Sequence, residues 1–209
     1  MARTVTSKLT NDRQRVAKTD GNPEGKGVNV LLDDWRATEP RGIVAKPPRQ
    51  VLADLFASML VLSAAFKYRP VTGGKNYLYW IDGEWSLSLI APDEWSGPRR
   101  AAFVATCVLQ RDMTWMIVPS DRLPGNDPAI HAIRRFYRGF VRMLDTDLTL
   151  EEILPFHVSS LSYYQRLHAS ALSRSVCTVL ARGDQDSKSA REWGRQLPHL
   201  DHALLAYSG

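Results

Sequence analysis

The sequence predicts an α+β protein: a four-stranded antiparallel meander backed by an N-terminal helix and followed by a helical C-terminal part. Three observations favour this class. First, residues 77–90 alternate apolar and polar side chains on either side of an Asp82-Gly83 pair. Second, apolar residues recur at helical spacing over residues 51–66. Third, the same helical spacing recurs over residues 128–180. Strands followed by helices in this order are typical of an α+β domain.

The first two strands are expected to form a hairpin around Asp82 and Gly83. Asp-Gly favours a type I′ turn, in which both central residues have positive φ. This turn would place Trp80 opposite Trp85. Because side chains alternate along a strand, one face is apolar and carries Leu78, Trp80, Trp85, Leu87 and Leu89. The other face is amphipathic and carries Tyr77, Tyr79, Glu84, Ser86 and Ser88.

Two further strands are expected over residues 103–110 and 113–118, with residues 92–95 forming a loop or one helical turn before them. Three segments of this region, Gly74–Tyr79, Ser88–Trp95 and Leu109–Trp115, resemble the linked motifs of the family catalogued as domain of unknown function 2452. The resemblance spans residues 66–118, about a quarter of the chain, and departs from the family where Ser96 precedes Gly97. It implies a common domain and no reaction, cofactor or catalytic residue.

The composition is that of an ordinary globular chain. Its 209 residues are 44% hydrophobic and 23% charged, with a net charge of +5. We expect a basic, disordered arm over residues 1–27, a helix-plus-sheet domain over residues 28–124 and a helical extension over residues 125–209 packed on that domain. Neither a secretory leader nor a membrane span is predicted, and Cys107 and Cys177 are expected to be reduced thiols in a cytoplasmic protein.

The helix over residues 51–66 begins after Pro47-Pro48 and should cover the tryptophan face of the sheet. On this basis Trp85→Ala should cost about 3–5 kcal/mol of stability.

A second helix should begin near Pro128, with Asp127 as its N-cap, and run to Leu144. Its apolar stripe leaves the opposite side basic, and that side carries Arg134, Arg135, Arg138 and Arg142. These arginines either bind an anionic partner or pair with acidic residues elsewhere.

Further helices are expected after a capping box at Thr149–Glu152, over residues 158–180 ending at Gly183, and over residues 190–207 with a break near Pro198.

The chain contains none of the common nucleotide-binding, hydrolase or metalloprotease motifs. Asp93-Glu94 suggests general acid catalysis or, more simply, capping of a tight loop. His199 and His202 could form a weak metal site. Cys177 and His168 could form a thiol-catalysis site. In each pair, a purely structural role is the simpler interpretation. We therefore expect no metal, cofactor or catalytic residue.

The amphipathic sheet face is the other candidate binding surface, because rings and hydroxyls together can stack bases or hold a peptide. It carries Tyr77, Tyr79, Ser86, Ser88, Thr106 and Thr114. The same face can instead be covered by the C-terminal helices.

These features favour a non-enzymatic cytosolic interaction or adaptor module with a protein partner of unknown identity. One alternative is a nucleic-acid-binding protein that uses the basic helix for phosphates and the tyrosines for bases. Another is an enzyme with a novel site near Asp93 and Glu94.

Overall fold

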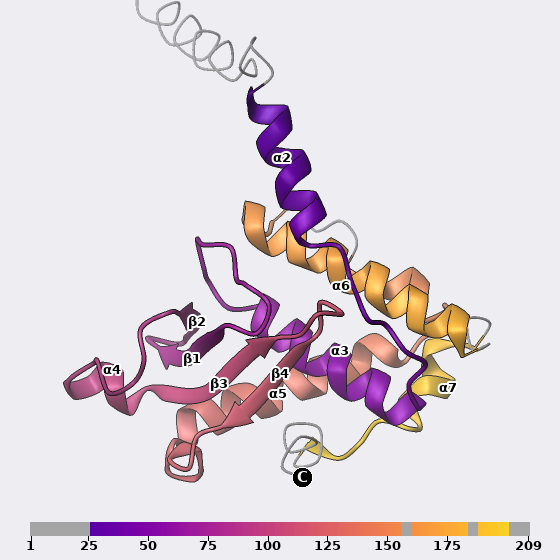
Figure 1. The fold of residues 1–209 in the computed structure, drawn as a ribbon. Coiled ribbons are helices and arrows are strands. Elements are labelled where there is room, and N and C mark those ends of the chain that lie inside the picture. Colours follow the sequence, from indigo (N-terminus) through magenta and orange to yellow (C-terminus); the bar gives the residue numbers. More distant parts are fainter. Residues whose placement is uncertain (1–25, 156–159, 184–187, 201–209) are drawn as a thin grey trace, which may run out of the picture. The chain divides into compact units, whose positions relative to one another are not determined.

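The computed structural model describes residues 26–155, 160–183 and 188–200 (Figure 1). The chain divides into two compact units, Met1–Ala37 and Thr38–Gly209. The described part of the first unit is a single helix, α2 (Lys26–Ala37). Of the expected basic arm, residues 1–25 lie outside the described residues, and Lys26 and Gly27 begin α2.

The second unit contains one antiparallel sheet of four strands in the order β2-β1-β3-β4. These strands are β1 (Lys75–Ile81), β2 (Glu84–Ser88), β3 (Phe103–Leu109) and β4 (Trp115–Pro119). The predicted α+β class and antiparallel sheet are confirmed. The meander order is wrong, because β3 pairs with β1 and not with β2.

The outer edge of β2 is already occupied, which explains the strand order. The backbone N–H of Ala65 donates to the carbonyl of Trp85 at 2.8 Å, and the N–H of Leu87 donates to the carbonyl of Ala65 at 3.1 Å. The chain after β2 therefore returns across the sheet, through the short helix α4 (Gly97–Ala101), to the free edge of β1.

The hairpin has the predicted register. Trp80 pairs with Trp85, Leu78 with Leu87 and Tyr79 with Ser86. Asp82 and Gly83 have φ angles of 51° and 83°, as a type I′ turn requires. The indole rings of Trp80 and Trp85 lie on one face, with centroids 4.6 Å apart, and both are half-buried against the core.

Helix α3 (Pro48–Leu62) packs along β4 on the inner face of the sheet, which is the face that carries Trp80 and Trp85. The sequence predicts this position. Nearly all of its residues after the first turn are buried, because it lies between the sheet and two further helices. Trp115 is the largest side chain in this layer and is only 1% exposed.

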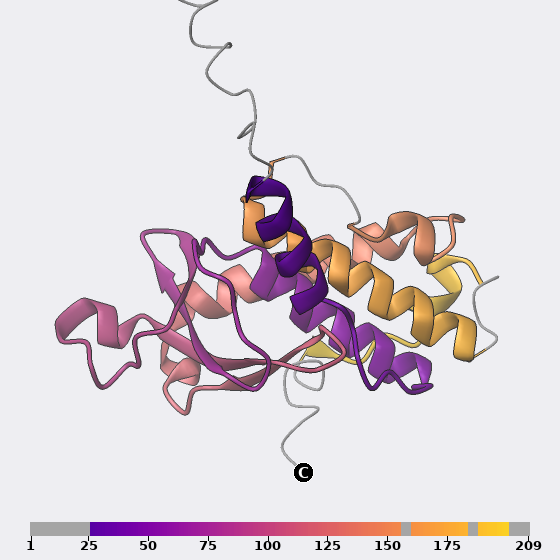
Figure 2. The ribbon, with the colours of Figure 1, turned by 45° about the horizontal axis from the view of Figure 1, so that its top comes forward.

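The C-terminal helices cover α3, not the outer face of the sheet. The ring of Phe56 on α3 contacts Phe136, Tyr137 and Phe140 of α5 (Asp127–Leu144) at centroid distances of 5.5–5.8 Å. Helix α6 (Tyr163–Arg182) runs alongside α3 in both views (Figures 1 and 2). Its Gln165 side-chain amide donates to the carbonyls of Leu62 and Ala64, at the end of α3.

Several boundaries in the C-terminal part differ from expectation. The N-cap of α5 is Asn126, whose side chain accepts from the N–H of Ala129, and a 3₁₀ turn, η2 (Leu123–Gly125), precedes it. Thr149 and Glu152 do bond reciprocally, but they open only a 3₁₀ turn, η3 (Glu151–Ile153). Helix α7 (Ala190–Gly194) is shorter than predicted, and residues 201–209 lie outside the described residues. Among the described helices, none has both the length and the apolar character needed to cross a membrane.

Candidate functional site

Tyr79, predicted on the amphipathic face of the sheet, is buried. Its side chain is 1% exposed, and its hydroxyl donates to the carbonyl of Ile90 at 2.8 Å. The chain between β2 and β3 folds back over this part of the sheet, which brings Ile90 and Trp95 to the ring. Burial raises the pKa of Tyr79 to about 12, and the neighbouring Trp95 indole only partly offsets this effect. Tyr79 is therefore a packing residue and has no free face for a base.

The other predicted residues of this face are partly used by the fold. Tyr77 is half-buried, with its ring edge against Phe103. Ser86 is half-buried beside the Ala65 bridge, and the Ser88 hydroxyl accepts from the N–H of Ile90 at 3.0 Å. Thr114 is buried in a turn. Tyr79 and Thr114 are therefore not available to a ligand on this face.

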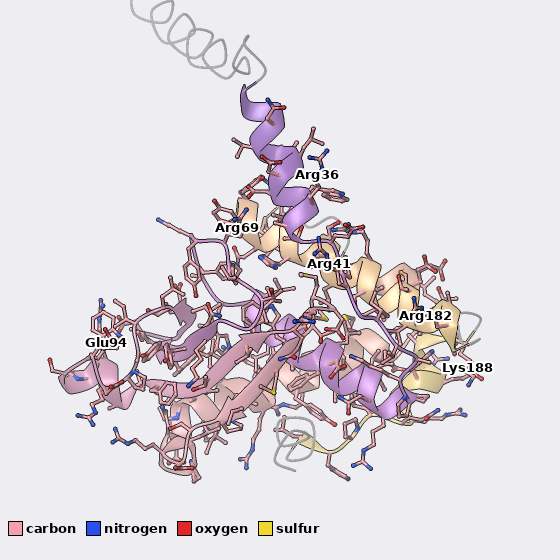
Figure 3. All side chains as sticks on the ribbon, in the orientation of Figure 1. Arg36, Arg41, Arg69, Glu94, Arg182 and Lys188 are labelled. Carbon is pink, nitrogen blue, oxygen red and sulfur yellow. The ribbon has the colours of Figure 1, made fainter. Side chains whose placement is uncertain are left out.

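Asp93 and Glu94 are both exposed in the loop between β2 and α4, and Figure 3 shows Glu94 at one end of the fold. A Glu94 carboxylate oxygen accepts from the N–H of Ala91 at 2.8 Å, and the N–H of Glu94 donates to the Ala91 carbonyl. Glu94 therefore caps its own loop, which is the simpler of the two roles considered for this pair.

Helix α5 presents the predicted basic face. Its apolar side packs on α3, so the opposite side faces solvent. All four predicted arginines on that side are exposed: Arg134, Arg135, Arg138 and Arg142. We call these four residues the arginine face. Within the described ranges, no carboxylate forms an ion pair with any of them.

A shallow hollow of about 490 Å³ runs along the arginine face. It is lined by Arg135, Tyr137, Arg138, Val141 and Arg142. Val141 is 42% exposed, and the Tyr137 hydroxyl donates to the carbonyl of Pro198, which fixes the ring at the edge of the hollow. The hollow thus places apolar surface between guanidinium groups.

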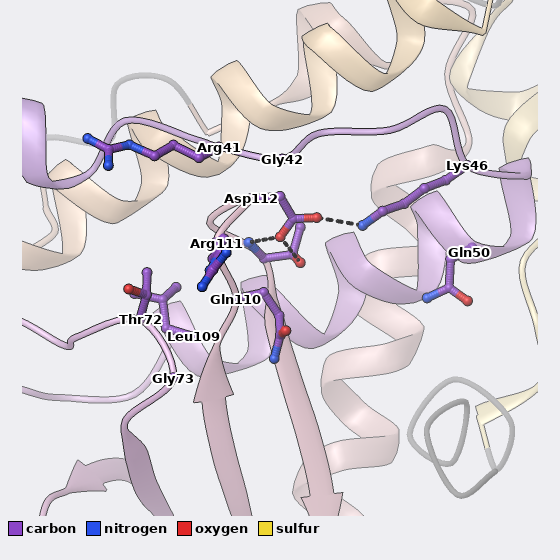
Figure 4. Close-up of a pocket in the computed structure, with 11 residues that line it drawn as sticks. Arg41, Gly42, Lys46, Gln50, Thr72, Gly73, Leu109, Gln110, Arg111 and Asp112 are labelled. Carbon is purple, nitrogen blue, oxygen red and sulfur yellow. Dashed lines mark hydrogen bonds and ion pairs between the residues drawn. The ribbon is translucent and has the colours of Figure 1, made fainter.

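A second, larger cavity of about 780 Å³ lies at the end of the sheet (Figure 4). The linker before α3, the loop before β1 and the turn between β3 and β4 form it, together with the first turn of α3. Its lining residues are Arg41, Gly42, Lys46, Gln50, Thr72, Gly73, Leu109, Gln110, Arg111, Asp112 and Thr114. We call it the end cavity.

A lysine held between two carboxylates joins the walls of the end cavity. The Lys46 ammonium lies 2.6 Å from Asp54 on α3 and 2.7 Å from Asp112 in the β3–β4 turn. The other oxygen of Asp112 accepts from the N–H and the hydroxyl of Thr114. Gln50 donates to the second oxygen of Asp54 at 2.7 Å. This network, the Lys46 cluster, fastens the linker to both the helix and the turn.

The protonation states of the Lys46 cluster follow from these contacts. Burial alone would lower the pKa of Lys46, but Asp54 and Asp112 outweigh it and raise that pKa above its usual value. Burial would likewise raise the pKa of Asp112, but Lys46 and Thr114 lower it overall. Lys46 is therefore a charged structural cation at neutral pH, and it is unsuited to act as a nucleophile.

The Lys46 cluster was not predicted from the sequence, although one signal for it was present. Asp54 is a carboxylate within a helix whose neighbouring positions are apolar, and the structure buries it. A buried carboxylate needs a cationic or donor partner. Gln50 lies one helical turn before Asp54 and could be anticipated, whereas the contact with Lys46 depends on the path of the linker before α3.

The metal and thiol alternatives gain no support. His202 lies outside the described residues, and no three metal-ligating side chains gather within the described part of the chain. Burial, together with Glu151, raises the pKa of Cys177 to about 12, so its thiol stays protonated. His168 is buried against Trp115, and its pKa falls to about 4 because burial disfavours the charged ring, with Arg69 adding to the effect.

Comparison of this chain with protein-family models, curated proteins and solved structures finds no match.

Proposed function

We propose that this chain is a non-enzymatic interaction module that binds an acidic surface of a protein partner through the arginine face of α5. The observation that carries the proposal is the exposure of four arginines on one side of a packed helix, with no ion pair to any described carboxylate. The Nε–H of Arg142 donates to the Arg138 carbonyl at 3.4 Å, and the remaining guanidinium donors of the arginine face are left for a partner.

A protein partner is favoured over nucleic acid by the hollow on the arginine face. Val141 and Tyr137 supply apolar surface between the guanidinium groups. Arginine and tyrosine around an apolar centre are the residues enriched at protein interfaces. Nucleic-acid binding would also need bases to stack, and burial of Tyr79 removes the central ring of the expected platform.

The charge distribution predicts how this binding responds to salt. The arginines lie at the surface, so their attraction to an acidic partner is screened as ionic strength rises. The apolar part of the hollow is insensitive to that screening. A protein partner should therefore lose affinity less steeply with salt than single-stranded RNA would.

Fluorescence anisotropy with two labelled probes tests the proposal: a peptide of mixed glutamate and leucine, and a single-stranded RNA of equal charge. We expect tighter binding of the peptide, and a loss of about ten-fold or more in Arg138→Ala with Arg142→Ala. A matched control removes two exposed arginines from other helices, Arg100→Ala with Arg166→Ala, and should keep the affinity. Equal losses in both variants would reject the arginine face, and tighter, salt-sensitive RNA binding would favour the nucleic-acid alternative.

We further propose a reducing, cytosolic location. Cys107 and Cys177 are both free thiols in the structure, and burial raises the pKa of Cys107 well above its usual range. Cysteines without a disulfide are typical of reducing compartments. Fractionation of the source cells, with recovery of the protein in a membrane or secreted fraction, would contradict this location.

Membership of residues 66–118 in the domain of unknown function 2452 family is also a proposal. Its support is that the resembling segments are structurally connected: the first carries Tyr79, whose hydroxyl bonds Ile90 in the second. The third holds Asp112 of the Lys46 cluster. A structure of an established family member with another strand order would reject the membership.

A further inference from the structure

The end cavity is bounded by three segments that backbone hydrogen bonds hold together. The N–H of Arg41 donates to the carbonyl of Arg111, and the N–H of Gly73 donates to the carbonyl of Leu109, each at 2.8 Å. Gly42 and Gly73 have φ angles of +67° and +78°, so the two outer segments bend where only glycine fits without strain. The walls are therefore preformed.

The cavity has a marked excess of hydrogen-bond donors. Both oxygens of Asp112 are already occupied, one by Lys46 and the other by Thr114. The Asp54 carboxylate behind it accepts from Lys46 and Gln50. The carboxylates of the site thus have little capacity left for a ligand, so the site is poorly suited to a cation.

The donors, in contrast, remain available. Arg41 and Arg111 are exposed, and neither guanidinium has an acceptor among the described residues. Each guanidinium carries five N–H donors, and the ammonium of Lys46 has a third N–H beyond the two that it gives to Asp54 and Asp112. Figure 4 shows Lys46 and Asp112 meeting in the middle of the site; the Arg41 side chain extends from the linker away from that pair, and Arg111 extends from the turn.

We propose that the end cavity is a binding site for a small molecule bearing an oxyanion, a carboxylate or a phosphate group, held by Arg41 and Arg111. An acceptor-rich anion is the ligand that complements this donor excess, and guanidinium groups bind such oxygens in a bidentate manner. The cavity volume of about 780 Å³ is in the range of small-molecule sites. This site is independent of the arginine face, and neither depends on the other.

The Lys46 cluster is the positioning element of this site. It fixes the linker that carries Arg41 to the turn that carries Arg111, so both guanidinium groups project from anchored backbone. An anchored arginine loses less conformational freedom on binding than a mobile one.

Site-resolved NMR titration of the full chain tests the proposal. The probes are inorganic phosphate and succinate, each compared with sodium chloride at equal ionic strength, and the readout is the amide signals of Gly42 and Gly73. We expect saturable shifts with at least one oxyanion and not with chloride. Saturation with phosphate alone would identify a phosphorylated ligand, and saturation with succinate alone a carboxylate ligand.

Variants decide whether the arginines cause the binding. Arg41→Gln with Arg111→Gln should weaken it about ten-fold or more, and both residues are exposed, so the fold should be retained. Arg100→Gln with Arg166→Gln, at two exposed arginines outside both sites, should leave it unchanged. Unchanged affinity in the first pair, equal shifts with chloride, or the absence of any saturable shift would overturn the proposal.

Discussion

The hydroxyl of Ser58, on α3, accepts a hydrogen bond of 2.9 Å from the backbone N–H of Trp115, on β4. The same hydroxyl donates to the carbonyl of Asp54 at 2.6 Å. One side chain thus satisfies a buried N–H on the sheet by bridging to the helix that covers it. The helix and the strand are joined by a polar contact inside an otherwise apolar layer.

Ser58→Ala should destabilise the protein by about 1–3 kcal/mol, because it leaves the buried Trp115 N–H without an acceptor. Urea unfolding followed by tryptophan fluorescence measures the change. Ser63→Ala is the matched control: the Ser63 hydroxyl donates to Leu60 from an exposed position and should matter little. Equal effects of the two substitutions would show that the bridge contributes nothing specific.

Lys46→Met should reduce the free energy of unfolding by about 2–4 kcal/mol, since it leaves the buried Asp54 carboxylate without its cation. Lys67→Met, at an exposed position, should change it by less than about 0.5 kcal/mol. Denaturant unfolding of both variants at neutral pH makes the comparison. A neutral result for Lys46→Met would mean that the two carboxylates do not need the lysine.

The contribution of Asp112 should disappear on acidification. Its pKa in the folded state is below the reference value of 3.8, so it stabilises the fold above about pH 4. Stability is lost as the pH falls through the lowered folded pKa. The difference in stability between the native chain and Asp112→Asn should therefore narrow below about pH 4, and a difference that stays constant down to pH 2 would contradict the assignment.

Protonation of His168 should lower the free energy of unfolding at a higher pH than protonation of Asp112 does. Its folded pKa of about 4 lies below the reference value of 6.5, so between these values the unfolded chain binds a proton that the folded chain does not. Each pKa unit of this difference corresponds to about 1.4 kcal/mol, so full protonation of His168 should remove about 3 kcal/mol from the free energy of unfolding. His168→Gln should flatten the stability profile between pH 6.5 and pH 4. The exposed His199→Gln should leave it unchanged, and a flat profile in the native chain would reject the prediction.

Trp115→Ala should be more destabilising than Trp85→Ala. Trp115 is fully buried and its loss should cost about 3–5 kcal/mol, whereas Trp85 is half-buried and should cost about half as much. The structure thus lowers the value that the sequence predicts for Trp85. Unfolding midpoints of the two variants at equal m-values give the order, and the reverse order would show that the hairpin contributes more to stability than the β4 layer.

Local chemistry explains which parts of the fold could be predicted. The Asp82-Gly83 turn sets the hairpin register by itself, and the 3.6-residue period of α5 places the arginine face. Burial of Tyr79 and the pairing of β3 with β1 depend on where a long connection folds back. No short-range pattern encodes that choice, because it depends on which strand edge Ala65 already occupies.

The end cavity could not be predicted from the sequence, because it also depends on contacts between segments that are distant in sequence. Arg41 and Arg111 are seventy residues apart, and only the tertiary fold brings their segments together. Each arginine taken alone resembles an ordinary surface cation. The donor excess becomes visible only once Asp54 and Asp112 are seen to be occupied by Lys46.

The partial occupation of both sheet margins has a consequence for the behaviour of the protein in concentrated solution. Ala65 pairs along β2, while on β4 the Trp115 N–H is occupied by Ser58 and Pro119 has no N–H to offer. Open strand margins are the templates on which chains add to one another as fibrils. Here the margin of β2 is paired at Ala65, and the margin of β4 offers no free N–H at Trp115 or Pro119, so strand addition at these positions would first have to detach the Ala65 segment or α3.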